Sequence, residues 1–160
     1  MSVSLFESLE SRCLKTAINW AGTSAADTIS VDIDSSNPNL VDVTQNGVVT
    51  QYSSVRSISV SGGGGNDTIT IGNSITIGCA ISGNAGSDTI VGGFGNDSIT
   101  GNAGADSING SAGDDVEWAV DQTTNSDSAH DTLYYSPAST GYTDTLNYNS
   151  TEDSIVQGGI

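Results

Sequence analysis

The sequence predicts an all-β protein built as a solenoid of short stacked coils, with a short helix at the N-terminus. A nine-residue glycine-rich repeat fills the centre of the 160-residue chain, and the segment before it alternates apolar and polar residues with the period expected of strands. With 20 glycines, 35% hydrophobic residues and few aromatics, the chain cannot fill a broad conventional core. A narrow, repetitive architecture therefore fits this composition best.

Residues 1–21 are predicted to form a helical cap. Ser4 and Glu7 have the spacing of a capping box, and the apolar residues Leu9 and Cys13 lie four positions apart, as on one face of a helix. The same segment has no basic n-region and no apolar h-region, so we expect that it is not a standard secretory signal.

Residues 22–61 are predicted to form the leading β coils. Ile29, Val31 and Ile33 alternate with polar residues, which is the pattern of a half-buried strand. The dipeptide Asn46-Gly47 lies between two apolar runs and indicates a tight hairpin turn.

The repeat block covers residues 62–118. Its three consecutive copies begin at Gly83, Gly92 and Gly101, and in each a glycine stands at positions one and four, an aspartate at position six and an isoleucine at position eight. Another copy begins at Gly62. Because these features keep one nine-residue period, a disordered glycine-rich linker explains them poorly.

The repeat weakens on both sides of its best copies. Residues 74–82 form a degenerate copy that still places Ile81 at the apolar position, and the copy from Gly110 loses its phase at Val116. Residues 119–160 are predicted to be irregular C-terminal coils, because an aspartate, a serine or threonine, and an isoleucine or leucine still recur there. Their end is expected to be open.

The copies are expected to stack with their aspartates in columns. Each copy makes one tight turn and one very short strand, and two copies make a full coil. One column then holds Asp67, Asp88 and Asp106, and the opposite column holds Asp97 and Asp115.

Strands stack about 4.8 Å apart, so neighbouring carboxylates repel by roughly 3 kcal/mol at an effective dielectric constant near 20. A hard cation that also accepts glycine carbonyls would compensate this charge, and calcium fits better than magnesium, zinc or copper.

This pattern resembles the RTX family of calcium-binding nonapeptide repeats, whose motif is Gly-Gly-x-Gly-x-Asp-x-apolar-x. The resemblance implies a right-handed parallel β-roll that holds calcium between its turns. By position, the implied ligand residues are the aspartates Asp67, Asp88, Asp97, Asp106 and Asp115 and the glycines Gly65, Gly86, Gly95, Gly104 and Gly113. The turn at residues 74–79 has no aspartate, so the site beneath Asp97 is in doubt. We expect about three or more weak sites, of the sub-millimolar extracellular kind.

Residues 6–14 carry a second resemblance, to the LEPR-XLL motif that begins large surface-destined proteins of some bacteria. Ser11 stands where that motif has proline, and Lys15 replaces the second leucine of the closing pair. A capped amphipathic helix that covers one end of the solenoid explains the segment equally well, and the two interpretations are compatible.

The charge excludes several classes of partner. The formal net charge is −16, and Arg12, Lys15 and Arg56 are the only basic residues, so binding to nucleic acid or to an anionic membrane is not expected. No stretch approaches the roughly 18 apolar residues of a membrane span. Two cysteines, Cys13 and Cys79, are too few for a disulfide framework, and their pairing stays open.

Three functions are compatible with the sequence, and the first is preferred. It is a non-catalytic, calcium-binding structural protein, secreted or on the cell surface, that associates with itself through its solenoid ends or with a surface or matrix polymer. The alternative is a calcium-triggered folding and secretion module of the type I export kind. An enzyme on a β-helix that acts on polysaccharides is disfavoured, because no basic residue follows Arg56 and the sole histidine, His130, lies in a polar loop.

Overall fold

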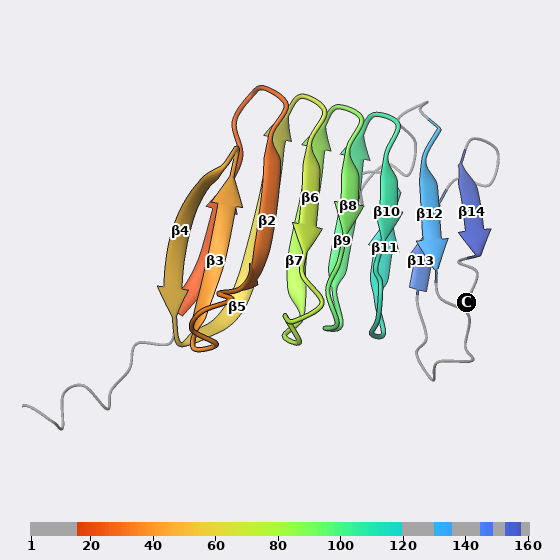
Figure 1. Cartoon of the computed structure of the whole chain (residues 1–160). Coiled ribbons are helices and arrows are strands. Elements are labelled where there is room, and N and C mark those ends of the chain that lie inside the picture. Colours follow the sequence, from red (N-terminus) through yellow and green to blue (C-terminus); the bar gives the residue numbers. More distant parts are fainter. Residues whose placement is uncertain (1–15, 120–129, 136–144, 149–152, 158–160) are drawn as a thin grey trace, which may run out of the picture.

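The chain passes back and forth between two β-sheets that face each other along a narrow stack (Figure 1). The computed structural model describes residues 16–119, 130–135, 145–148 and 153–157, and all regular elements in these ranges are strands. The all-β prediction is therefore confirmed for this part of the chain, whereas the right-handed winding stays a prediction. Within the same ranges, no helix has the length and apolar character that a membrane span requires.

The first sheet contains six strands that are all parallel to their neighbours. Their spatial order is β1 (Thr16–Ala21), β5 (Val55–Gly64), β7 (Cys79–Ala85), β9 (Ser98–Ala103), β11 (Val116–Trp118) and β13 (Thr145–Asn147). Ala80 pairs with Ser98, and Ser98 with Val116, so equivalent positions of successive coils lie directly beside one another.

The second sheet contains eight strands and is mixed. Their order is β14 (Ser154–Gln157), β12 (Thr132–Tyr135), β10 (Ser107–Asn109), β8 (Thr89–Val91), β6 (Thr68–Ile71), β2 (Thr28–Ile33), β3 (Leu40–Gln45) and β4 (Val48–Ser53). The strands from β14 to β2 are parallel, and β3 and β4 join as an antiparallel hairpin. Asn46 and Gly47 connect this hairpin with φ of 51° and 82°, so the predicted hairpin turn is confirmed.

The core is a double row of aliphatic side chains between the two sheets. The second sheet contributes the fully buried residues Ile29, Ile69, Ile90, Ile108 and Leu133, and the first contributes Val60, Ile81 and Ile99. Ile81 comes from the degenerate copy and is 2% exposed, as its place in the repeat predicts. Because each strand supplies only one or two of these side chains, each coil depends on its neighbours for burial.

The N-terminal end differs from the prediction. Residues 16–21 of the predicted helical cap form strand β1, because Ile18 and Trp20 alternate with polar or small residues and pair with Ile58 and Val60 of β5. The remainder of that segment, residues 1–15, lies outside the described residues.

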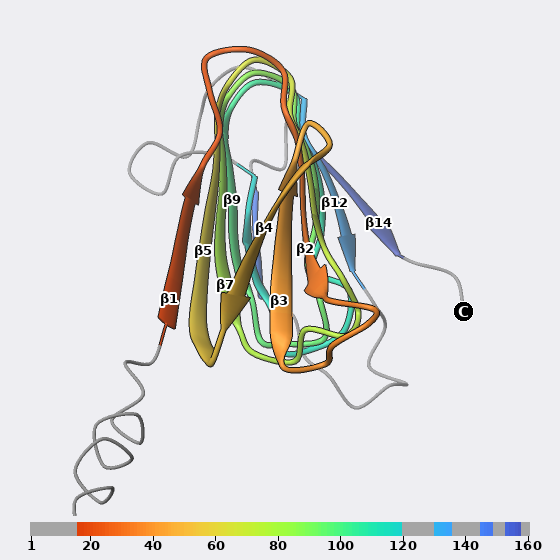
Figure 2. The same ribbon diagram turned by 60° about the vertical axis from the view of Figure 1, so that its left-hand side comes forward.

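The hairpin β3–β4 covers this end (Figure 2). Val41 and Val43 of β3 are buried, and the Trp20 and Tyr52 rings meet edge to face with centroids 6.4 Å apart. The Trp20 indole also donates a hydrogen bond of 2.9 Å to the Gln45 side-chain oxygen. In the described residues, the β3–β4 hairpin therefore covers the end of the stack that a helix was expected to cover.

We predict that Ile90→Ala lowers the free energy of unfolding by about 2–5 kcal/mol, because it opens a cavity in the double row. The side chain of Ile90 is fully buried, whereas that of its neighbour Thr89 points to solvent. Thr89→Ala on the same strand is the matched control and should change the value by about 0.5 kcal/mol or less. Urea unfolding in saturating calcium measures both, and equal losses would contradict this packing.

Candidate metal centre

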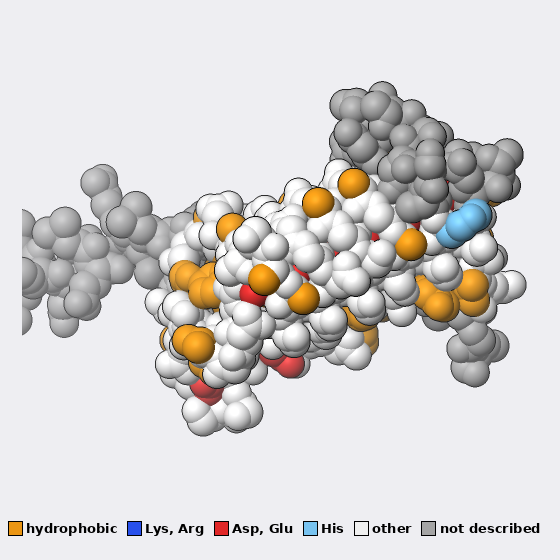
Figure 3. Space-filling model, turned by 90° about the horizontal axis from the view of Figure 1, so that it is seen from above, with side chains coloured by type: hydrophobic (Ala, Val, Ile, Leu, Met, Phe, Trp, Pro, Cys, Tyr) orange, Lys and Arg blue, Asp and Glu red, His pale blue; other side chains and the backbone are white. Residues whose placement is uncertain are grey.

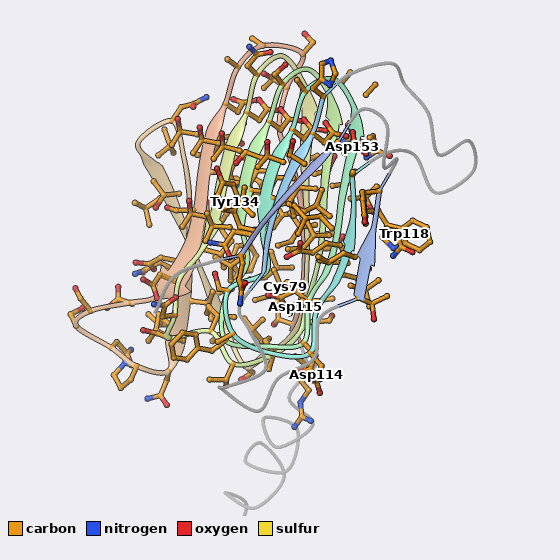
Figure 4. All side chains as sticks on the ribbon, turned by 90° about the vertical axis from the view of Figure 1, so that its right-hand side faces the viewer. Cys79, Asp114, Asp115, Trp118, Tyr134 and Asp153 are labelled. Atoms are coloured by element: carbon orange, nitrogen blue, oxygen red, sulfur yellow. The ribbon has the colours of Figure 1, made fainter. Side chains whose placement is uncertain are left out.

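Glycine-rich turns join the two sheets at opposite edges of the stack, and each edge carries a column of aspartates. The turns along the upper edge of Figure 1 lead into the strands of the second sheet. Their column comprises Asp27, Asp67, Asp88, Asp106, Asp131 and Asp153. The opposite column holds Asp97 and Asp115. Seen along the stack, Asp153 and Asp115 lie at opposite edges (Figure 4).

Hydrogen bonds tie each column together. Except in Asp27, the first of its column, the Oδ1 atom of each of these aspartates accepts the backbone N–H of the residue one coil earlier, as Asp88 does from Asp67 at 2.8 Å and Asp106 from Asp88 at 2.8 Å. Asp115 accepts the backbone N–H of Asp97 at 2.9 Å in the opposite column. The carboxylates therefore stack one coil apart, and all the predicted aspartates are 2% exposed or less.

The second carboxylate oxygen of Asp67 and of Asp88 has no such bond. Both Oδ2 atoms are buried and accept no hydrogen bond. A buried acceptor without a partner is costly in a folded protein and indicates a ligand or an ion that completes it.

A carbonyl oxygen of the next coil approaches the same place. A methyl group on Gly83 would collide with Asp88 Oδ2 and lie 2.8 Å from the carbonyl oxygen of Gly101. Gly62 has the same relation to Asp67 Oδ2 and the Gly83 carbonyl. Each of these glycines thus leaves a cradle in which one carboxylate oxygen and one carbonyl oxygen converge, and such all-oxygen donors suit calcium.

Asp97 and Asp27 are satisfied differently. Asp97 accepts the N–H of Cys79 at 2.8 Å on Oδ1 and the N–H of Gly93 at 3.0 Å on Oδ2. Asp27 accepts from Thr23 on Oδ2 and from Asn46 on Oδ1. Because protein donors already bond both oxygens, these two carboxylates have less capacity for a cation than Asp67 and Asp88.

The protein environment raises the pKa of some of these aspartates and lowers that of Asp27. Burial raises the pKa of Asp67, Asp88 and Asp97 above the ordinary value of 3.8. Hydrogen bonds, chiefly from Gln45 and Thr23, hold the pKa of Asp27 well below that value. The raised pKa values mean that ionised carboxylates are unfavourable here unless a positive charge compensates them.

Cys79 occupies the second column, one coil before Asp97 (Figure 4). Its thiol is buried and forms no disulfide. Burial, followed by the charge of Asp97, raises the pKa of the thiol to about 12. It is therefore protonated at neutral pH, and it packs as a small apolar residue.

The predicted ligand glycines stack in two columns, with Gly65, Gly86 and Gly104 at one edge and Gly95 and Gly113 at the other. Gly65, Gly86, Gly104 and Gly113 have positive φ, between 94° and 151°. A methyl group on Gly104 or Gly113 would collide with the carbonyl oxygen of Gly86 or Gly95, so these turns stack backbone on backbone. The carbonyl oxygens that approach the Gly62 and Gly83 cradles belong to Gly83 and Gly101, each the first glycine of a copy one coil further on, and the regular recurrence of that glycine was the signal for them. The role of the fourth-position glycines as calcium ligands stays a prediction.

Sequence reasoning also missed Glu117. It is fully buried at the isoleucine position of its copy, between Ile99 and Leu146 in the register of the first sheet. Its Oε1 accepts the N–H of Gly110 at 2.5 Å. A methyl group on Gly110 would lie 2.7 Å from this oxygen and would collide with Asp115 Oδ2, so a second carboxylate reaches this cradle.

No group of three or more His, Cys, Asp or Glu side chains within reach of one metal ion occurs in the described ranges. Carboxylates therefore enter the cradles singly or in pairs, and backbone carbonyls must supply the other oxygen ligands.

Comparison with known families matches residues 59–73 and 82–117 to the RTX calcium-binding nonapeptide repeat, in four copies. The chain carries RTX calcium-binding repeats. The matched RTX segments begin within β5 and end within β11, and they include the five predicted ligand aspartates but not Asp27, Asp131 or Asp153. No curated protein and no solved structure matches the chain.

We predict that Gly83→Ala raises the calcium concentration at the folding midpoint and weakens the RTX fold, because its methyl group would occupy the Asp88 cradle. Gly64→Ala is the matched control: its methyl group would meet only Ser24, at 3.5 Å or more, in ordinary contact. Circular dichroism during calcium titration measures both midpoints. Equal midpoints for the two variants would contradict the cradle.

We predict that the calcium-free RTX fold loses stability as the pH rises. The folded state holds protons on Asp67, Asp88 and Asp97 above pH 3.8, where the unfolded chain releases them, so the unfolding free energy falls through that range. Hydrogen bonds lower the pKa of Asp27 and Asp34, and these two groups oppose the trend only up to the ordinary value of 3.8. Urea unfolding in a chelator from pH 3 upward tests the sign. Stability that rises with pH without calcium would contradict it.

Proposed function

We propose that this chain is a non-catalytic calcium-binding structural protein whose β-roll folds outside the cell. The observation that carries the proposal is the buried Oδ2 of Asp67 and Asp88, each without a hydrogen bond and each facing a carbonyl oxygen of the next coil. Calcium between the coils would complete both oxygens and compensate the stacked charge.

The proposed ligand aspartates are Asp67, Asp88, Asp97, Asp106 and Asp115, and about three or more sites would form along the two columns. Asp67 and Asp88 are the strongest candidates, whereas Asp97 already accepts two protein hydrogen bonds. We assign the carbonyl ligands to the glycine turns, with the first-position glycines Gly83 and Gly101 beside the fourth-position glycines.

The location outside the cell follows from the chemistry of such a site. Extracellular calcium modules bind with dissociation constants of about 0.1–1 mM, so the array would stay uncompensated at the low calcium concentration of a cytosol. RTX repeat proteins are typically secreted or attached to the cell surface, which supports the same location. The partners that we propose are a second copy of the chain and a cell-surface or matrix polymer.

A calcium-triggered folding and secretion module is the second candidate function. The same carboxylate columns favour it, because their repulsion would keep the chain unfolded before export and calcium would fold it afterwards. Export measured in a strain that lacks its type I transporter distinguishes the two. Loss of export would support the secretion role.

A role in catalysis has less support. The only basic residues of the sequence are Arg12, Lys15 and Arg56, which precede the RTX block, and His130 is exposed. A polysaccharide-acting site needs a group that can transfer a proton or bind an acidic sugar beside the metal. The carboxylates at the cradles are assigned to the cation, and the matched repeats at residues 59–73 and 82–117 contain no histidine, lysine or arginine.

We predict that calcium induces the β signal of this chain and that Asp88→Asn raises the calcium concentration at the midpoint by on the order of tenfold, which corresponds to about 1.4 kcal/mol. Asparagine keeps the acceptor for the Asp67 N–H but removes the charge. Asp32→Asn, at an exposed aspartate outside both columns, is the control and should shift the midpoint less than about twofold.

Circular dichroism and light scattering of the full chain during calcium titration provide the measurement. A full β signal in chelator that calcium does not change would overturn the proposed function. Equal shifts for Asp88→Asn and Asp32→Asn would show that calcium acts only by general screening.

A further inference from the structure

The turn at residues 110–115 differs from the equivalent turn one coil earlier. In the earlier turn, the Gly92 N–H donates to the carbonyl oxygen of Asn109 at 2.8 Å. A methyl group on Gly92 would lie 2.5 Å from both Asp97 Oδ2 and the Gly110 carbonyl oxygen. Backbone oxygens of the next coil therefore complete the turn that begins at Gly92.

A glutamate side chain takes both of these places at Gly110. The Gly110 N–H donates to Glu117 Oε1 at 2.5 Å. A methyl group on Gly110 would lie 2.7 Å from the same Oε1 atom and would collide with Asp115 Oδ2. The carboxylate of Glu117 thus supplies at this turn what backbone carbonyls supply at Gly92, and it brings a second negative charge to the cradle.

The surroundings of these two carboxylates are apolar and dry. In the register of the first sheet, Glu117 lies between Ile99 and Leu146, and its side chain is fully buried. Asp115 is 1% exposed. Two buried carboxylates that converge on one point repel each other, and each has lost the hydration that stabilises its charge. Such a pair either shares a proton or holds a cation.

A cation for this pair has to come from solution. The sequence has no lysine or arginine after Arg56, which lies on β5 with β7 and β9 between it and β11. On the upper face of the molecule, the described residues likewise show no lysine or arginine side chain (Figure 3). The RTX match ends at residue 117 and so includes both carboxylates in a calcium-binding repeat.

The equivalent cradles of the first column point to the same ligand independently. Asp67 Oδ2 and Asp88 Oδ2 are buried, accept no hydrogen bond and lie beside the first glycine of their copies. Asp115 Oδ2 has the same position beside Gly110. A cation that completes the oxygens of the first column would therefore meet two carboxylates at Gly110, and calcium accepts glutamate as well as aspartate oxygens.

We propose that Glu117 binds calcium together with Asp115, as a second carboxylate ligand that the regular RTX copies lack. Those copies have isoleucine at this position. The site draws two charged ligands from one coil, and an additional anionic ligand strengthens calcium binding. The inference rests on the proposed function, because calcium bound at the RTX turns is the ion that Glu117 meets.

Terbium luminescence of the full chain tests this site, with Tb³⁺ as the probe in place of calcium. Trp118 directly follows Glu117 on β11, and an excited tryptophan transfers energy to a lanthanide ion close to it. Wild type should show terbium emission that Trp118→Phe removes and that excess calcium displaces. Glu117→Gln keeps an acceptor for the Gly110 N–H but removes the charge, so it should raise the terbium concentration at half-maximal emission by at least about tenfold.

Asp114→Asn is the matched control. Asp114 is exposed in the same turn as Asp115, so the substitution makes the same change of charge outside the cradle (Figure 4). It should shift the terbium midpoint less than about twofold. Equal shifts for Asp114→Asn and Glu117→Gln would overturn the proposal, because the ion would then respond only to general charge. An unchanged midpoint in Glu117→Gln would also overturn it and would indicate a shared proton.

Glu117→Ile is the second variant and serves if Glu117→Gln fails to fold. It restores the isoleucine of the regular copies, so it should keep the calcium-induced β signal and lose the terbium emission beside Trp118. Terbium binding as tight as in wild type would show that Glu117 has only a structural role.

Circular dichroism on the same samples separates this inference from the proposed function. If wild type gains β signal with calcium and the Glu117 variants bind terbium as wild type does, the ligand role of Glu117 alone is wrong. If wild type gains no β signal with calcium, the proposed function is wrong as well.

Discussion

The fold depends on buried aspartate carboxylates that stack on one another although they carry the same charge. Each coil places an aspartate directly beside that of the next coil, and one oxygen of each carboxylate accepts the backbone N–H of its neighbour. This bond fixes the register between coils, and it also brings the charges together. At about 4.8 Å of separation, repulsion of roughly 3 kcal/mol per pair would accumulate along the column unless a cation removed it.

The other features of the fold accommodate this column. The first glycine of each copy leaves room for the remaining carboxylate oxygen, as Gly83 does for Asp88. The aliphatic core is only one or two side chains wide on each strand, so apolar burial alone gives each coil little stability. Stacking of the backbone and of the aspartate column therefore holds the RTX segment together, and the same ladder of hydrogen bonds extends into its flanks through Asp27 and Asp131.

Much of this architecture could be predicted from the nine-residue repeat. Period nine gives two copies per coil, which places Asp67, Asp88 and Asp106 on one edge and Asp97 and Asp115 on the other. The hairpin at Asn46-Gly47 was predictable because both residues readily take positive φ. The repeat also explains why the apolar position of a degenerate copy, Ile81, stays buried.

Other features depend on contacts between distant residues, which no local sequence pattern indicates. Residues 16–21 became a strand because β5 offers Ile58 and Val60 as partners, and helical spacing upstream gives no sign of that edge. Glu117 is buried because its carboxylate reaches the N–H of Gly110 in the same coil. The sequence also could not show which glycine carbonyls approach the cradles. The first and fourth positions of the repeat are both glycine, and only the turn geometry distinguishes them.

The most direct test of the calcium account is the anomalous difference map of crystals grown in millimolar calcium. The account predicts peaks at the upper turns, about 2.3–2.6 Å from the Oδ2 atoms of Asp67 and Asp88. Peaks confined to exposed acids such as Asp32, with none beside these two oxygens, would contradict it.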